Sequence, residues 1–299
     1  MHGGALTGWP IRLWGKPRMP DSGDSIKTSA DNTKDPRIFT EDYYRRIYEV
    51  EERHWWHRGM RYIADALLDP FLPHGKRLAI LDAGCGTGGT FGWLERKGVS
   101  GFAVGVDFSE HALSFCRKRS HAPVGRASAV ELPFAAESFD LITCVDVLQH
   151  LPALGGDLAA VKEFSRTLKP GGLVFVRTNA AVEKGTLASG AENYRKYAMK
   201  DIESLMTASG LDVLRLTRAN WLLIFTERLS QAIGRGQRKS QACKDHGLTI
   251  RLLPPWLGWL NELLAQVLHL EAICLKQSDR SFTKGRSTMC VARKPFRVG

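Results

Sequence analysis

The sequence predicts an α/β fold, a Rossmann-like, doubly wound sheet of seven mostly parallel strands. Strand and helix patterns alternate between residues 76 and 179, and this alternation implies right-handed crossovers between parallel strands. A short apolar strand at 78–82 runs directly into a glycine-rich turn at 84–89, the place where a doubly wound sheet binds a nucleotide-like cofactor. Two further strand patterns, at 211–217 and 287–293, complete the seven.

Local patterns predict the other elements. Residues 1–38 are rich in Gly, Pro, Ser, Asp and Lys without periodicity, so we expect a disordered leader there. Residues 39–75 place apolar side chains at helical spacing after an N-cap at Thr40, which predicts N-terminal helices. The remaining strands are expected at 102–107, 122–127, 140–145 and 172–178. The remaining helices are expected at 89–97, 109–119, 157–168, 200–209 and 256–275.

The composition narrows the class of protein. A chain of 299 residues with 43% hydrophobic residues can bury a substantial core. Its net charge of +11 indicates an anionic partner, such as nucleic acid, phospholipid head groups or a phosphorylated substrate. Basic runs at 117–119 and 235–244 fit either such a partner or a solvated surface.

The cysteines and the apolar runs indicate in which cellular compartment the protein is found. The six cysteines form no CxxC pair and no zinc spacing, so we predict no metal site and a reducing cytoplasm. No signal peptide is recognisable, and no run reaches the roughly 20 apolar residues of a membrane span. Met19 could replace Met1 as the start of the protein.

Acidic residues stand at the ends of the first two strands. Asp82 comes just before the first glycine of the turn, and Asp107 ends the second strand. Glycine lets bare backbone approach a ligand and tolerates positive φ. An ionised carboxylate at Asp107 has two acceptor oxygens for a ligand.

Five landmarks follow one another along the chain: Leu78–Gly89, Val104–Ser109, Glu131–Phe134, Ser138–His150 and Leu168–Gly172. In this order and spacing they resemble the class I S-adenosylmethionine (SAM)-dependent methyltransferases, in particular the small-molecule group called type 11. The leader Glu49–Trp56 is similar to the E-x-x-HWW leader of a bacterial subgroup. The resemblance implies SAM as the cofactor, one antiparallel strand in the sheet and a helical lid at 39–75. It also implies a SAM-binding core at 76–219, a substrate cap at 220–286 and a last core strand with its tail at 287–299.

The resemblance also implies roles for individual residues. Asp107 would bind the ribose, and Asp82 would act indirectly by ordering the glycine-rich turn. Phe108 and Leu148 would pack against the two faces of the adenine. Many relatives carry an acid near Ser128 that receives the adenine amine, and this chain has none. The cofactor-binding residues expected are Asp82, Gly84, Cys85, Gly86, Gly88, Asp107, Phe108, Ser128, Ala129, Val145 and Asp146.

Methyl transfer from a sulfonium needs alignment more than a catalytic group, and a base only if the acceptor is a hydroxyl or an acidic carbon. His150, after the fourth strand, is the candidate base, and it equally fits a pocket-lining or helix-capping role. Asp82 also fits a purely structural turn-capping role. His54 and His57 share a helical face with Glu51, but they lack a fourth ligand for a metal.

We therefore expect a methyltransferase acting on a small-molecule or lipid-linked acceptor, with a peripheral contact to an anionic membrane through 235–244. The net charge favours an RNA or protein methyltransferase as the alternative. Against this alternative, the sequence contains no RNA-binding module and no Asn/Asp-Pro-Pro-aromatic motif, so nucleic acid is not the expected partner. A non-catalytic SAM-fold protein and an NAD enzyme are also compatible with the glycine-rich turn. The sequence predicts neither the acceptor atom nor the oligomeric state.

Overall fold

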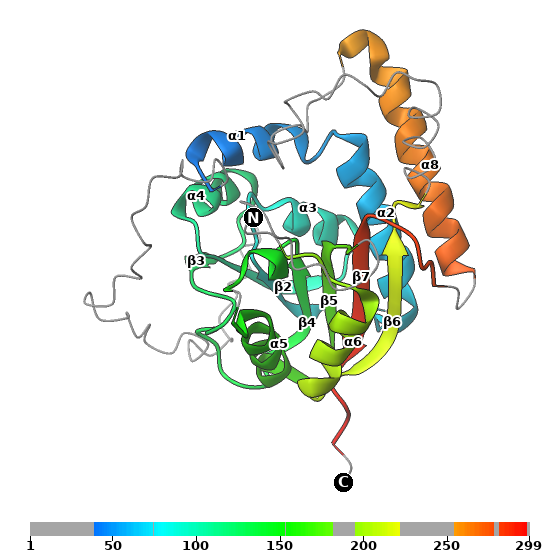
Figure 1. The fold of residues 1–299 in the computed structure, drawn as a ribbon. Coiled ribbons are helices and arrows are strands. Elements are labelled where there is room, and N and C mark those ends of the chain that lie inside the picture. The colour runs from blue at the N-terminus through cyan, green and yellow to red at the C-terminus, as the bar shows by residue number, and fades with distance from the viewer. Residues whose placement is uncertain are drawn as a thin grey trace.

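The computed structural model describes residues 39–73, 75–152, 154–181, 195–221, 254–277 and 281–297. It is built around one seven-stranded sheet in the order β3-β2-β1-β4-β5-β7-β6 (Figure 1). β7 is antiparallel to both of its neighbours, whereas β1 to β5 pair in parallel. The predicted fold class is therefore confirmed. The strands are β1 (Leu78–Ala83), β2 (Ser100–Asp107), β3 (Val124–Arg126), β4 (Phe139–Val145), β5 (Leu168–Asn179), β6 (Asp212–Ala219) and β7 (Ser287–Arg293).

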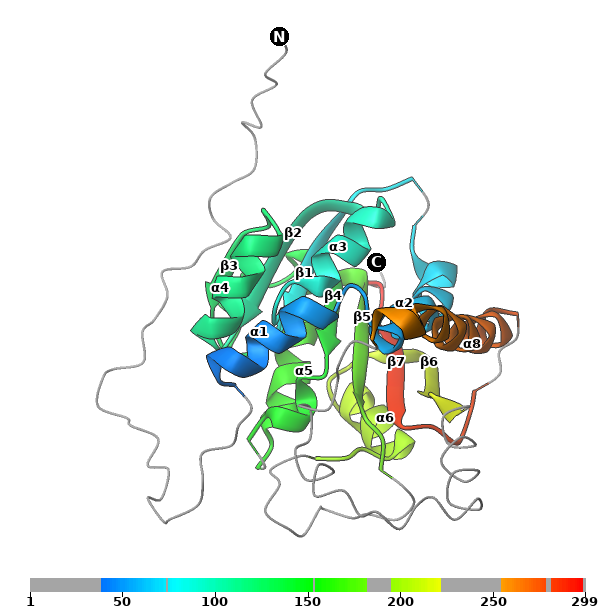
Figure 2. The same ribbon diagram turned by 90° about the horizontal axis from the view of Figure 1, so that it is seen from above.

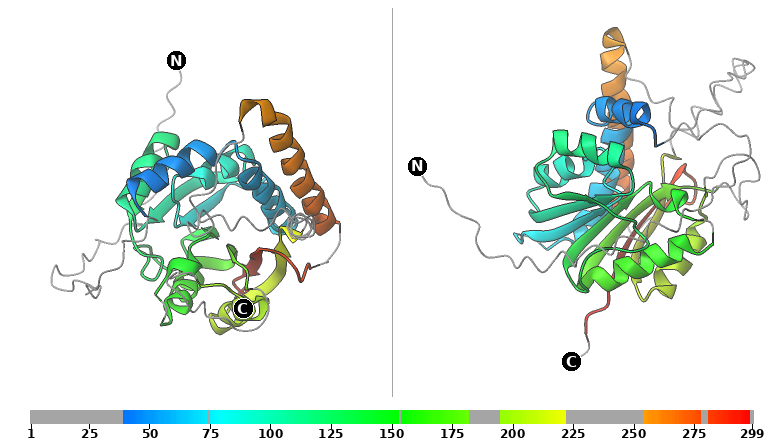
Figure 3. Two further views of the ribbon diagram at one scale, coloured as in Figure 1. Left: turned by 45° about the horizontal axis from the view of Figure 1, so that its top comes forward. Right: turned by 90° about the vertical axis from the view of Figure 1, so that its left-hand side faces the viewer.

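Helices cover both faces of the sheet (Figure 3). One face packs against α2, α3 and α8, and the other against α5 and α6. The helices are α1 (Glu41–Val50), α2 (Trp55–Leu68), α3 (Gly89–Arg96), α4 (Glu110–Arg119), α5 (Gly156–Thr167), α6 (Met199–Ala208) and α8 (Gly258–Lys276). Short 3-10 turns lie at η2 (Asp69–Phe71), η3 (Leu148–His150) and η6 (Pro255–Leu257).

The N-terminal helices form a corner over the sheet. Thr40 caps α1 by accepting a hydrogen bond from the backbone N–H of Tyr43, as the sequence predicts. The helical segment then breaks at 51–54, and His54 caps α2 through the N–H of Trp56. In the view from above, α1 lies next to α4 over the carboxyl ends of the parallel strands (Figure 2). The corner therefore stands where a doubly wound sheet binds its ligand.

The helix expected at 256–275 forms as η6 and α8 and packs along α2. Leu268 is fully buried against Gly59, where a Cβ atom would come within 2.2 Å of its Cδ1. Trp256, Leu263 and Ile273, three apolar residues of this segment, are exposed. α8 instead turns its Ala265, Leu268, Ala272 and Leu275 side toward the core.

Two expectations fall outside the described residues: the disordered leader at 1–38 and the basic loop at 235–244. Among the helices that the structure describes, none has the length and apolar character needed to cross a bilayer.

Candidate functional site

The glycine-rich turn after β1 depends on its glycines. Gly84, Gly86 and Gly88 have φ angles of 87°, 53° and 87°, which side-chain-bearing residues rarely adopt. A Cβ atom at Gly84 would lie 2.1 Å from Val147, whereas one at Gly86 would meet no atom within 4 Å. The backbone at Gly86 therefore faces open space, as a ligand-binding turn requires.

Asp107 lies beside this turn, as the sequence predicts. Its Oδ2 accepts a hydrogen bond from the N–H of Gly86 (2.9 Å), and its Oδ1 accepts one from the N–H of Ser109 (2.8 Å). A carboxylate has about four acceptor positions, so two remain for a ligand. Burial raises the pKa of Asp107, while the backbone N–H groups of Ser109, Gly86 and Phe108 lower it. The residue fits a pair of ribose hydroxyls.

Asp82 is buried beneath the turn and does not line it. Its Oδ1 accepts a hydrogen bond from the Thr143 hydroxyl (2.7 Å). Burial raises the pKa of Asp82 to about 7, although hydrogen bonds from Thr143 and Thr90 act in the opposite direction and lower it. This position agrees with an indirect role in ordering the turn, and it equally fits a purely structural one.

The end of β4 carries a strained residue. Asp146 has a φ of 59°, and its N–H donates to the carbonyl of Arg177 on β5 (2.9 Å). The two side chains form an ion pair, with Arg177 Nε 3.2 Å from Asp146 Oδ1. The Arg177 guanidinium lies over the Trp56 ring, 4.8 Å from its centroid. Sequence reasoning missed Arg177, although a lone arginine after the apolar run 173–176 was the available signal.

The residues expected around the adenine differ in their exposure. Phe108 is 67% exposed, and the Arg126 guanidinium lies 5.3 Å from its ring centroid. Leu148 is fully buried in the core and offers no exposed face, so the predicted sandwich does not form on that side. The Ala129 side chain is also buried, and the partly buried Ser128 caps its own turn by accepting from the N–H of Val130.

His150 lies in η3, close to the end of β4. The ring of Phe39, just before α1, contacts it edge-on with centroids 5.3 Å apart. Burial lowers the pKa of His150, and the charge of Asp146 opposes this. The imidazole is therefore neutral at neutral pH, which is the form that accepts a proton.

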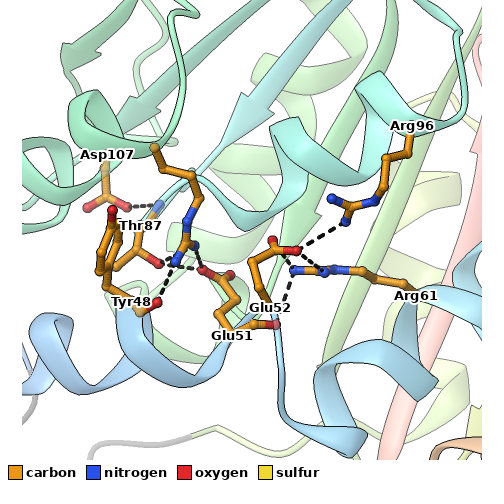
Figure 4. Close-up of polar contacts among 9 residues, drawn as sticks. Tyr48, Glu51, Glu52, Arg61, Thr87, Arg96 and Asp107 are labelled. Carbon is orange, nitrogen blue, oxygen red and sulfur yellow. Dashed lines mark hydrogen bonds and ion pairs between the residues drawn. The ribbon is translucent and has the colours of Figure 1, made fainter.

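Glu51, at the corner between α1 and α2, reaches the glycine-rich turn (Figure 4). It accepts hydrogen bonds from the Thr87 hydroxyl and from the Arg119 guanidinium, which also donates to Thr87 (3.2 Å). Burial, and then the charges of Asp146 and Glu51, raise the pKa of Tyr43 to about 12. The N-terminal segment therefore spans the ends of β4, β1 and β2.

Glu52 ties the same corner to α2 and α3. It accepts from Arg61 (2.9 and 3.0 Å) and from Arg96 (3.3 Å), as Figure 4 shows. No group of three potential metal-binding side chains comes together in the part of the chain that the structure describes. His54 acts as a helix cap.

Comparisons with known proteins agree with this geometry. A family model described as "Methyltransferase domain" matches residues 81–176. A protein of Encephalitozoon cuniculi (strain GB-M1) that is named as a methyltransferase is 30% identical over 208 residues, covering 60% of this chain and 92% of the relative.

Two further relatives have more specific names. A tRNA (carboxymethyluridine(34)-5-O)-methyltransferase of Arabidopsis thaliana is 31% identical over 163 residues (54% of this chain, 39% of the relative). A demethylmenaquinone methyltransferase of Staphylococcus aureus (strain MRSA252) is 36% identical over 104 residues (33% and 42%). The chain thus spans less than half the length of these two.

One solved structure illustrates the fold. A chain from the complex between the Haloferax volcanii Trm112 methyltransferase activator and a methyltransferase aligns with a TM-score of 0.54 at 16% identity. The alignment covers 89% of this chain and all of that one.

Proposed function

This chain belongs to the class I SAM-dependent methyltransferases of type 11, and on that premise we propose that its acceptor is a small or lipid-linked molecule. SAM supplies an activated methyl group on a sulfonium, so the protein chiefly aligns donor and acceptor. Asp107 and the bare backbone at Gly86 fit the adenosine end of SAM. We assign the ribose hydroxyls to the two free acceptor positions of Asp107.

His150 is the proposed proton acceptor for a hydroxyl or an acidic carbon. Its ring is held between Phe39 and the end of β4, and burial keeps it neutral. A neutral imidazole is ready to take a proton as the new bond forms. The N-terminal segment 39–75 is proposed as a lid that excludes water from the site.

One observation carries the choice of acceptor: an exposed apolar stripe on α8 and the turn before it. Trp256, Trp259 and Leu263 are 75%, 64% and 52% exposed. Asn261 fastens this end of α8 to the corner by accepting from the N–H of Trp55 (2.9 Å) and donating to the carbonyl of Arg53 (3.0 Å). An apolar surface next to the cofactor site suits the tail of a lipid-linked acceptor.

The same stripe supports a peripheral contact with a membrane surface. Exposed tryptophans and leucines on one side of a helix bury into the boundary between head groups and acyl chains. The net charge of +11 favours an anionic surface. We also propose a reducing, cytoplasmic location, which the free Cys85, Cys116, Cys144, Cys274 and Cys290 support.

The test is incubation with methyl-labelled SAM and cell extract, followed by separation of lipid, small polar, RNA and protein pools. Label should enter the lipid or small-molecule pool and should disappear with the Asp107→Ala protein. Label confined to RNA or protein would refute the proposed acceptor class. A protein with Trp256 and Trp259 both replaced by serine should lose sedimentation with anionic vesicles.

RNA is the second candidate acceptor. The net charge of +11 and the similarity to a tRNA methyltransferase favour it. A gel shift whose affinity falls steeply with salt would support RNA as the acceptor. Tight SAM binding without transfer to any pool would instead support a non-catalytic protein.

A further inference from the structure

An open cleft lies between α2 and α3. It has a volume of about 330 Å³, and its lining includes Arg61 of α2, Trp93 of α3 and Glu52 at the corner before α2. Sites for small ligands in proteins have volumes of roughly 300–1,000 Å³. The lining differs from the residues assigned above to the adenosine, so the cleft is a separate space.

Positive charge is in excess inside the cleft. Asp65 is occupied by Lys97 (2.6 Å) and by the indole N–H of Trp93 (2.8 Å). The other acid of the lining, Glu52, accepts hydrogen bonds from two of the arginines. This balance favours an anionic ligand. The charged side chains that line the cleft are four cations and two acids: Arg58, Arg61, Arg96 and Lys97, with Glu52 and Asp65.

Arg96 has donors available for such a ligand. It extends from α3 to Glu52, which Arg61 approaches from α2 (Figure 4). The contact of Arg96 with Glu52 is a single one of 3.3 Å, and its side chain is 57% exposed. A guanidinium group carries five N–H donors. Most of those of Arg96 are therefore free to bind an anion in the part of the chain that the structure describes.

Tyr62 and Arg58 add polar groups from α2. Arg58 donates to both carboxylate oxygens of Glu262 on α8 (2.5 and 2.9 Å) and to the hydroxyl of Tyr62. A tyrosine hydroxyl that accepts a hydrogen bond keeps its own proton for a further acceptor. Phosphate oxygens accept strongly from both guanidinium and hydroxyl donors. A hydroxyl beside guanidinium groups therefore suits a phosphate group.

The cleft adjoins the exposed apolar stripe on α8. α8 lies along α2, as the view from above shows (Figure 2). Glu262, which binds Arg58, directly precedes Leu263 of the stripe, and the Tyr62 ring lies 4.6 Å from the ring of His269 on α8. A helix whose apolar side enters a membrane surface lies at the level of the lipid head groups. A membrane that received the stripe would therefore bring its head groups next to the cleft.

We propose that this cleft binds the phosphate group of an anionic lipid head group, with Arg96 and the Tyr62 hydroxyl as its contacts and Arg58 beside them. The inference rests on the membrane contact proposed above, and it adds the site that selects an anionic lipid. The apolar stripe then binds the acyl boundary, and the cleft binds the head group. A free phosphorylated molecule has the same chemistry, and the experiment separates the two sources.

The test is sedimentation with vesicles of phosphatidylcholine alone and of phosphatidylcholine mixed with phosphatidylglycerol. The wild type should prefer the mixed vesicles. Arg96→Met should weaken binding to the mixed vesicles at least about tenfold, the effect of losing one hydrogen bond to a charged group, and leave binding to phosphatidylcholine unchanged. Lys276→Met is the matched control, because Lys276 carries the same charge on α8 but lies outside the cleft. It should show at most the few-fold effect of one charge near an anionic surface.

Tyr62→Phe removes only the hydroxyl and serves if Arg96→Met does not fold; it too should weaken binding to the mixed vesicles alone. Equal weakening by Arg96→Met and Lys276→Met would refute the cleft as a site and leave a general effect of charge. So would an unchanged affinity of both cleft variants.

Thermal unfolding with glycerol phosphate, a soluble head group, separates this inference from the membrane contact. Glycerol phosphate should raise the Tm of the wild type and of the protein with Trp256 and Trp259 replaced by serine, but not that of Arg96→Met. A wild type that responds in this way and ignores both kinds of vesicle would refute the lipid source and assign the cleft to a free phosphorylated molecule. A wild type that binds the mixed vesicles but gives no such response would refute the phosphate site and leave the membrane contact standing.

Discussion

Replacing Asp107 by alanine should weaken SAM binding at least tenfold, because it removes the carboxylate assigned to the ribose. The carboxylate already accepts from the N–H groups of Gly86 and Ser109, which leaves two acceptor positions. A hydrogen bond to a charged group contributes about 1.5–3 kcal/mol, and about 1.4 kcal/mol corresponds to tenfold in affinity. Loss of a single ribose contact is therefore sufficient for the expected effect.

The assay is titration calorimetry with S-adenosylhomocysteine, together with thermal unfolding of each variant. Asp140→Ala is the matched control, since Asp140 also accepts from a backbone N–H (Ala79, 2.8 Å) but lies at the start of β4, at the opposite end of the sheet. The control should bind with wild-type affinity. A folded Asp107→Ala protein with unchanged affinity would refute the ribose assignment, and equal weakening by Asp140→Ala would show that the effect is general.

Three further predictions concern activity, stability and pH. His150→Ala should lower kcat while the affinity for SAM stays unchanged. Because burial lowers the pKa of His150, the rate of the wild-type protein should fall only below about pH 6.5. A fall in rate at higher pH would contradict this role. Leu268→Ala should lower the free energy of unfolding in urea by about 2–5 kcal/mol, since the side chain is fully buried between α8 and α2. Leu270→Ala, at an exposed position of the same helix, should change it by no more than about 0.5 kcal/mol. Similar losses for the two variants would mean that α8 packs differently. The free energy of unfolding should decrease as pH rises from about 4 to about 7, because Asp82 keeps its proton up to about pH 7 in the folded protein but loses it near pH 3.8 in the unfolded chain. Asp82→Asn should flatten this pH dependence. An unchanged slope would show that another group causes it.

The sheet was predictable because each parallel strand carries a local signal. The apolar run before the glycine turn and the segment Leu168–Gly172 locate β1 and β5 to within a few residues. Asp107 was predictable for the same reason, since the end of β2 must lie beside the end of β1 in a doubly wound sheet.

The polar partners of the site were not predictable, because they come from distant parts of the chain. Glu51 meets Thr87 and Arg119, which lie 36 and 68 residues further on. Arg177 meets Asp146 across two strands, and its position next to Trp56 depends on where the N-terminal corner folds. Pairing of this kind is decided by tertiary packing, which a periodicity does not encode.

The buried side of α8 was not predictable for a related reason. Apolar residues occur on more than one side of this helix, so spacing alone does not say which side faces α2. Gly59 on α2 lacks the Cβ atom that would collide with Leu268, so the side of α8 that carries Leu268 can pack closely there.

The most direct test of the account is an experimental structure of the complex with S-adenosylhomocysteine. We expect the ribose hydroxyls within hydrogen-bonding distance of Asp107 and the adenosine over the backbone at Gly86, with α1 closed above them. A ligand bound elsewhere, or tyrosine side chains of α1 filling the space between Asp107 and Asp146 with the ligand present, would contradict it.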